Sequence, residues 1–168
     1  MLLQPAHHSL DVEALYRRYE LPLERFLLGI LGDAELAQDL AQDTFAAACR
    51  WPERVEEAIS PEVWLFSVAR HYAMSALRRH YRLGAAVRQI ASRERPPASL
   101  VSSTQDAVDL LSVLAPEDRA IVLLRYWYGF PAVEIAAITD RTPEAVRTRL
   151  ERCRPALAKR LEAMEHGR

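Results

Sequence analysis

Apolar residues recur every three or four positions along most of the chain, which is the spacing of one face of an α-helix. The first such stretch runs from Asp11 to about Leu31, and Pro22 is expected to interrupt it. Gly32 and Asp33 then predict a helix end followed by a new N-cap, so a second helix is expected over residues 34–50.

A third helix is predicted from Pro61 to about Tyr81, with Ser60 as its N-cap, while residues 52–60 are expected to form a loop. The periodicity assigns this helix an inward face and an outward, arginine-bearing face. The expected inward residues are Leu65, Val68, Ala69, Tyr72 and Leu77, and the expected outward residues are Arg70, Arg78 and Arg79. Trp64 and Phe66 are also assigned to the core.

The character of the sequence changes at residues 83–104, where Pro96-Pro97 and several serines predict a flexible linker. Further helices are predicted over about 105–114, from Pro116 to Tyr128, from Pro131 to Ile138, and from Pro143 onward. No run of alternating β-branched residues indicates a sheet. The expected fold is therefore all-α, with two small helical domains, 10–82 and 105–162, on either side of the linker.

The last two predicted helices are separated by a short turn at 139–142, which is the spacing of a helix-turn-helix unit. Thr142 can cap the second of these helices, whose first turn holds Glu144 and whose exposed N–H groups favour phosphate. Val146, Leu150 and Cys153 form its apolar stripe, while Arg147, Thr148, Glu151 and Arg152 lie off it. The same pattern also fits an amphipathic helix with solvated arginines.

Charge is strongly segregated in a chain of 168 residues whose net charge is only −1. Residues 1–60 carry five basic and eleven acidic side chains, whereas residues 61–95 carry seven basic and two acidic ones. Residues 96–118 carry no basic and four acidic side chains, and residues 119–168 carry ten basic and six acidic ones. Two basic blocks suit nucleic acid, and the acidic first block is expected to face a different, basic partner.

Signatures of catalysis are missing from the sequence. It has no glycine-rich phosphate loop, no Cys/His set at metal-ligand spacing and no nucleophile elbow. Asp39 and Asp43 lie four apart, but a solvated helix face explains them better than a catalytic or metal-binding pair. We therefore expect a protein that is not an enzyme and that holds no metal or cofactor.

The two cysteines are far apart, which favours a reduced compartment over a disulfide framework. The N-terminal residues lack the charged and apolar regions of a signal peptide, and no apolar stretch reaches membrane-spanning length. A soluble cytoplasmic protein is expected.

Three stretches carry a resemblance to a known family. They are "DVEALYRRYELPLERFLLGILGDAELAQDLAQDTFAAACR", "SPEVWLFSVARHYAMSALRR" and "LAPEDRAIVLLRYWYGFPAVEIAAITDRTPEAVRTRLERCRPAL". In this order and at this separation they resemble the extracytoplasmic-function (ECF) group of the sigma-70 family of bacterial sigma factors. The match covers about residues 10–82 and 105–162.

The resemblance implies a promoter-specificity subunit whose partners are core RNA polymerase and promoter DNA. The acidic helix 34–50 would dock on the clamp-helix coiled coil of the largest polymerase subunit, through Asp39, Gln42 and Asp43. The segment at 52–60 and the third helix would melt the minus-ten element, with the strand-tracking residues Arg70, Arg78, Arg79 and Arg82. The final helix would enter the major groove of the minus-thirty-five element, with the candidate contacts Thr142, Glu144, Arg147, Thr148, Arg149 and Arg152. Arg119 and Arg125 match family positions, and an anti-sigma factor is expected from the family.

Some positions depart from the family pattern. Gln38 stands where an acid is common, and Asp140 stands where the turn usually has glycine. The opening Pro143-Glu144-Ala145 is unusual for a recognition helix, and Pro155 should kink this helix or end it near Arg154. These departures affect the expected promoter sequence rather than the class.

Two alternative functions fit parts of the same pattern. One is a helix-turn-helix regulator that binds duplex operators without polymerase, and the other is a helical interaction protein that has lost promoter activity. Polymerase-dependent initiation distinguishes the sigma factor from both.

Overall fold

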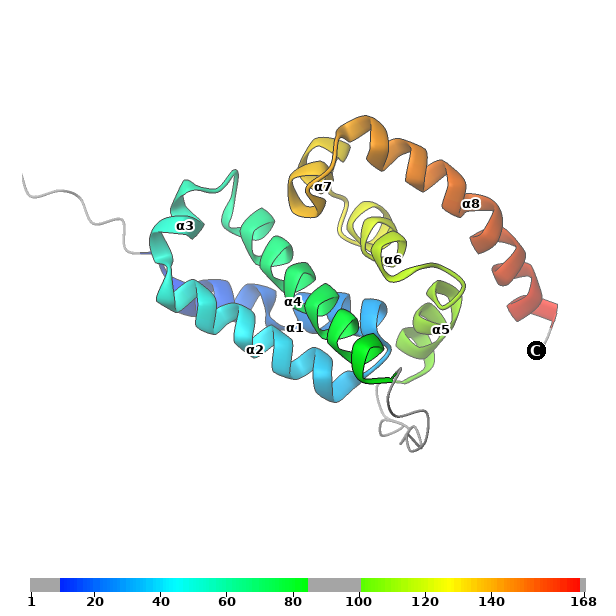
Figure 1. The fold of residues 1–168 in the computed structure, drawn as a ribbon, viewed down its shortest axis with the longest axis horizontal. Helices are drawn as coiled ribbons and strands as arrows, with labels where there is room; N and C mark the ends of the chain where they lie inside the picture. The colour runs from blue at the N-terminus through cyan, green and yellow to red at the C-terminus, as the bar shows by residue number, and fades with distance from the viewer. Residues whose placement is uncertain (1–9, 85–100, 167–168) are drawn as a thin grey trace, which may run out of the picture.

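The structure, a computed structural model, describes residues 10–84 and 101–166, and within these ranges the chain is helical with no β-strand. Two groups of helices lie side by side (Figure 1). The first half of the molecule comprises α1 (Val12–Leu31), α2 (Ala34–Arg50), α3 (Pro52–Glu57) and α4 (Pro61–Gly84). The second half comprises α5 (Val101–Leu111), α6 (Pro116–Val122), the π-helix η2 (Leu123–Trp127), α7 (Ala132–Thr139) and α8 (Pro143–His166). The all-α prediction with two helical units is confirmed.

The helix starts of the first half follow from short polar caps, of which the sequence predicted Asp33 and Ser60 but not Asp11. Asp11 accepts a hydrogen bond from the Ala14 N–H at 2.9 Å, and Asp33 accepts one from the Leu36 N–H at 3.0 Å. Gly32 ends α1 with a φ of +70°, a conformation that glycine adopts without strain. These caps fix the antiparallel hairpin of α1 and α2, against which α4 packs.

Three boundary predictions for the helices are wrong. Pro22 does not interrupt α1, because the helix continues through it. Residues 52–57 form the short helix α3 rather than a loop, with Pro52 in its first turn and Val55 buried beneath it. Pro155 was expected to kink α8 or to end it near Arg154, and the second alternative is wrong, since that helix runs on to His166. In α1 and α8 the helix persists although the proline removes one backbone hydrogen bond, whereas Pro52, in the first turn of α3, removes none.

The turns of the second half depend on two left-handed residues. Gly129 has a φ of +73° and follows η2, and Asp140 has a φ of +52° and a ψ of +52° and ends α7. Aspartate is one of the few residues besides glycine that tolerates this region. The helix-turn-helix geometry therefore survives the replacement of the usual glycine.

The two halves pack directly on each other, a contact that the sequence did not predict. Helices α1 and α4 lie against α5, α6 and α7, and the buried residues form one continuous core. Phe66 of α4 is central to it, since its ring centroid lies 5.0 Å from that of Phe26, 4.9 Å from Tyr128 and 5.2 Å from Phe130. Such aromatic pairs add about 0.5–1.5 kcal/mol each beyond simple burial. Of the linker expected over residues 83–104, residues 85–100 lie outside the described residues, while 83–84 end α4 and 101–104 begin α5, so the prediction is wrong at both ends.

Glu62, in the first turn of α4, is one of the few acidic groups at this contact whose pKa is perturbed. Burial raises the pKa of its carboxyl, the charge of Glu134 on α7 raises it further, and Arg18 and Tyr19 oppose the shift. A position at a helix N-terminus alone would favour the charged form, so burial outweighs the helix dipole here.

This shift predicts that Glu62→Gln stabilises the protein at neutral pH. A carboxyl whose pKa is raised by folding contributes stability below its unfolded pKa and loses it as the pH rises through the folded pKa. The midpoint of urea unfolding at pH 7 should therefore be higher for Glu62→Gln than for the wild type, and the difference should shrink below about pH 4.5. Glu56→Gln, at an exposed position of α3, is the matched control and should leave the urea midpoint unchanged both at pH 7 and at acidic pH. A lower midpoint for Glu62→Gln at pH 7 would contradict this account.

Candidate nucleic-acid interface

The helix-turn-helix unit is built by α7 and α8 around a small apolar seam. Val146, Leu150 and Cys153 of α8 are buried, and burial raises the pKa of the Cys153 thiol. Thr142 caps α8 by accepting a hydrogen bond from the Ala145 N–H at 3.2 Å, as predicted. Thr142 and Glu144 are exposed at this end of α8, and the uncapped N–H groups of a helix N-terminus favour phosphate.

The candidate contacts on α8 fall into two sets. Arg147, Thr148 and Arg152 are exposed, and Arg147 pairs only loosely with Glu144 at 3.6 Å. Arg149 points instead toward α6, where its guanidinium donates to the carboxylate of Asp118 and its side chain is only 27% exposed. The structure therefore groups three of the predicted residues on an open face and places Arg149 against the body of the second half.

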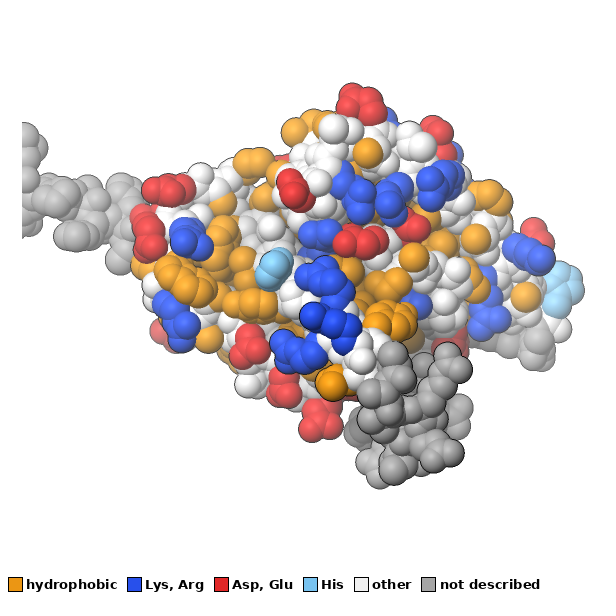
Figure 2. All heavy atoms as spheres, in the orientation of Figure 1, with side chains coloured by type: hydrophobic (Ala, Val, Ile, Leu, Met, Phe, Trp, Pro, Cys, Tyr) orange, Lys and Arg blue, Asp and Glu red, His pale blue; other side chains and the backbone are white. Residues whose placement is uncertain are grey.

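The basic residues of α4 also divide in two. Arg78, Arg79 and Arg82 are exposed near the C-terminal end of the helix, and Arg82 donates to the Arg78 carbonyl at 3.3 Å. Arg70 was expected to face outward, but its side chain is only 15% exposed, because it forms a bidentate ion pair with Glu117 of α6. Basic side chains gather over α4 and over α8 on the same face of the molecule, with acidic side chains between them (Figure 2).

The predicted docking residues Asp39, Gln42 and Asp43 are all exposed on α2. The opposite face of this helix packs against α1 and α4 through small residues and one aromatic ring, namely Ala37, Ala41, Phe45 and Ala48. Spacing of three and four residues places the three polar side chains on one continuous outer strip. Gln38 is exposed beside them. Because family members commonly have an acidic residue at this position, glutamine leaves the surface with one negative charge fewer.

Trp51, at the junction of α2 and α3, lies in a cluster that the sequence reading missed. The guanidinium carbons of Arg50 and Arg54 each lie 5.4 Å from the centroid of its ring. The sequence signal for this cluster is an arginine one residue before the tryptophan and another three residues after it. The prediction of a loop from residue 52 gave no reason to expect Arg54 beside the ring. The cluster presents aromatic and cationic groups together, which is the chemistry that single-stranded nucleic acid favours.

Arg119 of α6 is a partly buried cation of the second half. It donates to the carbonyls of Ile30, Leu111, Leu114 and Ser112 at 2.8–3.3 Å, and burial lowers its pKa. All of these acceptors belong to the main chain, so Arg119 has a structural role in connecting α1, α5 and α6. Arg125 is more exposed and donates only to the Phe130 carbonyl at 3.2 Å.

No group of His, Cys, Asp and Glu side chains within residues 10–84 and 101–166 is arranged to hold a metal ion. Among the described helices, none combines the length and apolar character needed to cross a membrane.

Comparison with known proteins identifies both halves. Residues 15–83 match the family model for sigma-70 region 2, and residues 104–157 match that for sigma-70 region 4. The protein is thus a two-domain sigma factor of the sigma-70 type. It is 30% identical to the ECF RNA polymerase sigma factor SigL of Mycobacterium tuberculosis, over 93% of this chain and 90% of that protein. It belongs to the ECF sigma factors of the sigma-70 family.

Two further relatives agree with this assignment. The RNA polymerase sigma factor CarQ of Myxococcus xanthus is 32% identical over 83% of both chains. The sigma factor RpoE of Bartonella quintana, solved in complex with the anti-sigma factor NepR, superimposes with a TM-score of 0.78. That match has 25% sequence identity and covers 90% of this chain and 97% of the other.

Proposed function

We propose that this sigma factor directs core RNA polymerase to promoters through three separate surfaces, and that the polymerase performs all the catalysis. The observation that carries the proposal is that each type of surface implied by the family resemblance lies in its expected half. An acidic strip lies on α2, exposed arginines lie on α4, and a capped basic helix closes the helix-turn-helix unit. Its place of action would be the cytoplasm, where the polymerase works.

The acidic strip is assigned to core polymerase. Asp39 and Asp43 present two carboxylates, and Gln42 adds an amide between them. A basic helical surface on the polymerase would complement this strip, because opposite potentials steer encounter and set the register of docking. The polymerase would thus be held on the first half.

The arginines of α4 are assigned to the melted minus-ten strand. Arg78, Arg79 and Arg82 can follow the phosphate backbone of a single strand, and the Trp51 cluster offers an aromatic platform at the other end of the first half. Arg70 would join them once its carboxylate partner is removed. Binding to isolated DNA should be weak and should fall steeply with salt.

Helix α8 is assigned to the major groove of the minus-thirty-five element. Its capped N-terminus suits a phosphate, and Arg147, Thr148 and Arg152 are placed to reach base edges. Glu144 and Thr142 lie in the same opening turn, and Arg149 remains a candidate contact although Asp118 holds it toward α6. An anti-sigma factor is proposed as a further partner by analogy with the RpoE–NepR complex.

A run-off transcription assay with core polymerase tests the assignment. Initiation should require both this protein and a promoter selected from a random library, and it should start at one defined position. Failure to initiate at any selected promoter would contradict the sigma-factor function. Operator binding that needs no polymerase would instead support the regulator alternative.

Substitution of Arg147 or Arg152 by alanine should weaken promoter recognition. Loss of one base or phosphate contact typically costs about 1–3 kcal/mol, so each variant should lower promoter affinity of the holoenzyme by about tenfold or more. The thermal stability should be unchanged because both side chains are exposed. Lys159→Ala, on an exposed position of the same helix, is the control and should bind normally. An equal loss for Lys159→Ala would indicate non-specific attraction only.

A further inference from the structure

We propose that Glu151 of α8 reads one base of the minus-thirty-five element and selects cytosine there. The inference rests on the proposed function, because it assumes that α8 enters the major groove of this element. It goes beyond that function by assigning one base of the promoter to one side chain. Glu151 would act as a specificity residue, since it would exclude wrong sequences rather than add general affinity for DNA.

Four exposed residues of alternating charge form a row along α8. They are Glu144, Arg147, Glu151 and Arg154, and we call them the charge row. Steps of three, four and three residues place successive members on the same side of a helix. Phosphate attraction alone favours a row of basic side chains, because a carboxylate repels the DNA backbone. The acidic members of the row therefore need a separate explanation.

Glu144 has a structural explanation, and Glu151 does not. Glu144 lies in the first turn of α8, where a carboxylate interacts favourably with the helix dipole, and it is 3.6 Å from Arg147. Glu151 lies two turns further along, where the dipole gives no such benefit. None of the ion pairs among the described residues includes Glu151. Its exposed carboxylate is therefore available to a ligand.

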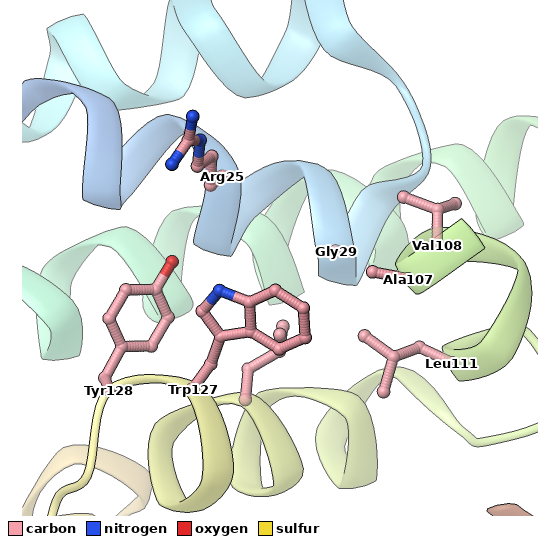
Figure 3. A pocket seen from close by; sticks show the side chains of 8 residues that line it. Arg25, Gly29, Ala107, Val108, Leu111, Trp127 and Tyr128 are labelled. Carbon is pink, nitrogen blue, oxygen red and sulfur yellow. The ribbon is translucent and has the colours of Figure 1, made fainter. Parts of the chain in front are cut away.

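The neighbour of Glu151 at the end of the charge row is held by η2. The hydrogen bond that Arg154 donates to the Tyr126 oxygen raises the pKa of the arginine, and the negative charge of Glu151 raises it further. Trp127, the next residue of η2, instead lines a cleft beside Gly29 of α1 (Figure 3). Because Tyr126 also holds Arg154, this arginine does not depend on Glu151 as its partner.

The inner side of α8 fixes the direction in which Glu151 points. Leu150 and Cys153, which flank Glu151 in the sequence, are buried against the second half. Arg149 pairs with Asp118 of α6 on the same side of the helix. These contacts oppose rotation of α8 about its axis, so Glu151 stays on the outer face that would meet the groove.

A carboxylate discriminates among bases because it only accepts hydrogen bonds. In the major groove cytosine presents the N4 amino donor, whereas guanine presents two acceptors and thymine presents an acceptor beside a methyl group. Adenine presents the N6 donor beside the N7 acceptor, which would repel the second carboxylate oxygen. Cytosine is therefore the base that fits Glu151, and a wrong base would leave the carboxylate desolvated without a partner.

Selection from a library of promoters with random minus-thirty-five positions tests this assignment. Holoenzyme formed from core polymerase and the full chain binds the library, and the bound DNA is sequenced. The wild type should prefer cytosine by about tenfold or more at one position of the element. Glu151→Ala should reduce this preference to about twofold or less and should leave the other positions unchanged.

Glu151→Gln provides a second variant with a different expected result. It keeps the size of the side chain but adds an amide donor, and such an amide pairs with N6 and N7 of adenine. The preference at the same position should therefore change from cytosine to adenine. Glu162→Ala removes another exposed acidic residue of α8, outside the charge row, and as the matched control it should leave every position unchanged. All three variants should unfold at the wild-type temperature, because both positions are exposed.

An element without a cytosine preference in the wild type, or an unchanged cytosine preference in Glu151→Ala, would overturn the proposal. A uniform gain of affinity for every sequence would also overturn it, because Glu151 would then only repel phosphates. In each of these cases an enriched element with polymerase-dependent run-off transcription would retain the sigma-factor function. The absence of any enriched element would contradict the proposed function and the role of Glu151 together.

Discussion

Charge reversal at Asp39 and Asp43 is expected to abolish binding to core RNA polymerase, with a loss of affinity of about 100-fold or more. Both side chains are exposed on α2, outside the face that packs on α1 and α4, so Asp39→Lys with Asp43→Lys should leave the fold intact. The loss arises because two attractive contacts become repulsive ones against a basic partner surface. Affinity is measured by titrating labelled sigma factor with core polymerase, at two salt concentrations.

The matched control reverses two acidic residues that lie elsewhere. Glu162 and Glu165 are exposed near the end of α8, and the change to lysine at both positions alters the net charge by the same amount. This control should bind polymerase as the wild type does. Unchanged binding by the Asp39/Asp43 variant would show that the docking face lies elsewhere, and equal loss in both variants would attribute the effect to net charge.

Arg119→Ala is expected to lower the free energy of unfolding by about 3–5 kcal/mol. The substitution leaves main-chain carbonyls of two segments without their charged donor, namely Ile30 in the last turn of α1 and Leu111, Ser112 and Leu114 between α5 and α6. A half-buried carbonyl that loses such a partner is not fully compensated by water. Urea unfolding followed by circular dichroism measures the change.

Arg125→Ala serves as the control for this prediction. It removes the same side chain a few residues along the chain, but Arg125 is exposed and donates to the Phe130 carbonyl alone. Its expected cost is about 1 kcal/mol, the value of a single hydrogen bond. Similar losses for the two variants would show that the network of Arg119 contributes nothing beyond one bond.

The helices of both halves could be predicted because their signals are local. Asp33, Ser60 and Thr142 each accept the cap hydrogen bond that their sequence position predicted, at 3.0–3.2 Å. The buried stripe of α8 also follows directly from helical spacing. Errors arose at the prolines, where a helix persists because tertiary contacts outweigh a local penalty.

The candidate site was predictable only in part. Exposure of Asp39, Gln42 and Asp43 follows from their spacing opposite an apolar stripe, and the exposure of Arg147, Thr148 and Arg152 follows in the same way. Arg70 and Arg149 appear equivalent to the other arginines in the sequence, yet each is held by a carboxylate of α6. No local pattern predicts which arginine lies within reach of a carboxylate 47 or 31 residues away.

By itself the sequence determined the helices, their caps, the order of acidic and basic blocks and the membership of the family, because each depends on neighbouring residues or on motif spacing. Only the tertiary structure decided that the two halves share one core around Phe66, that Arg119 supports the main chain, and that Glu117 occupies Arg70. The physical reason is that these contacts join residues far apart in the chain, and their energies depend on distance and burial, which composition and periodicity do not specify.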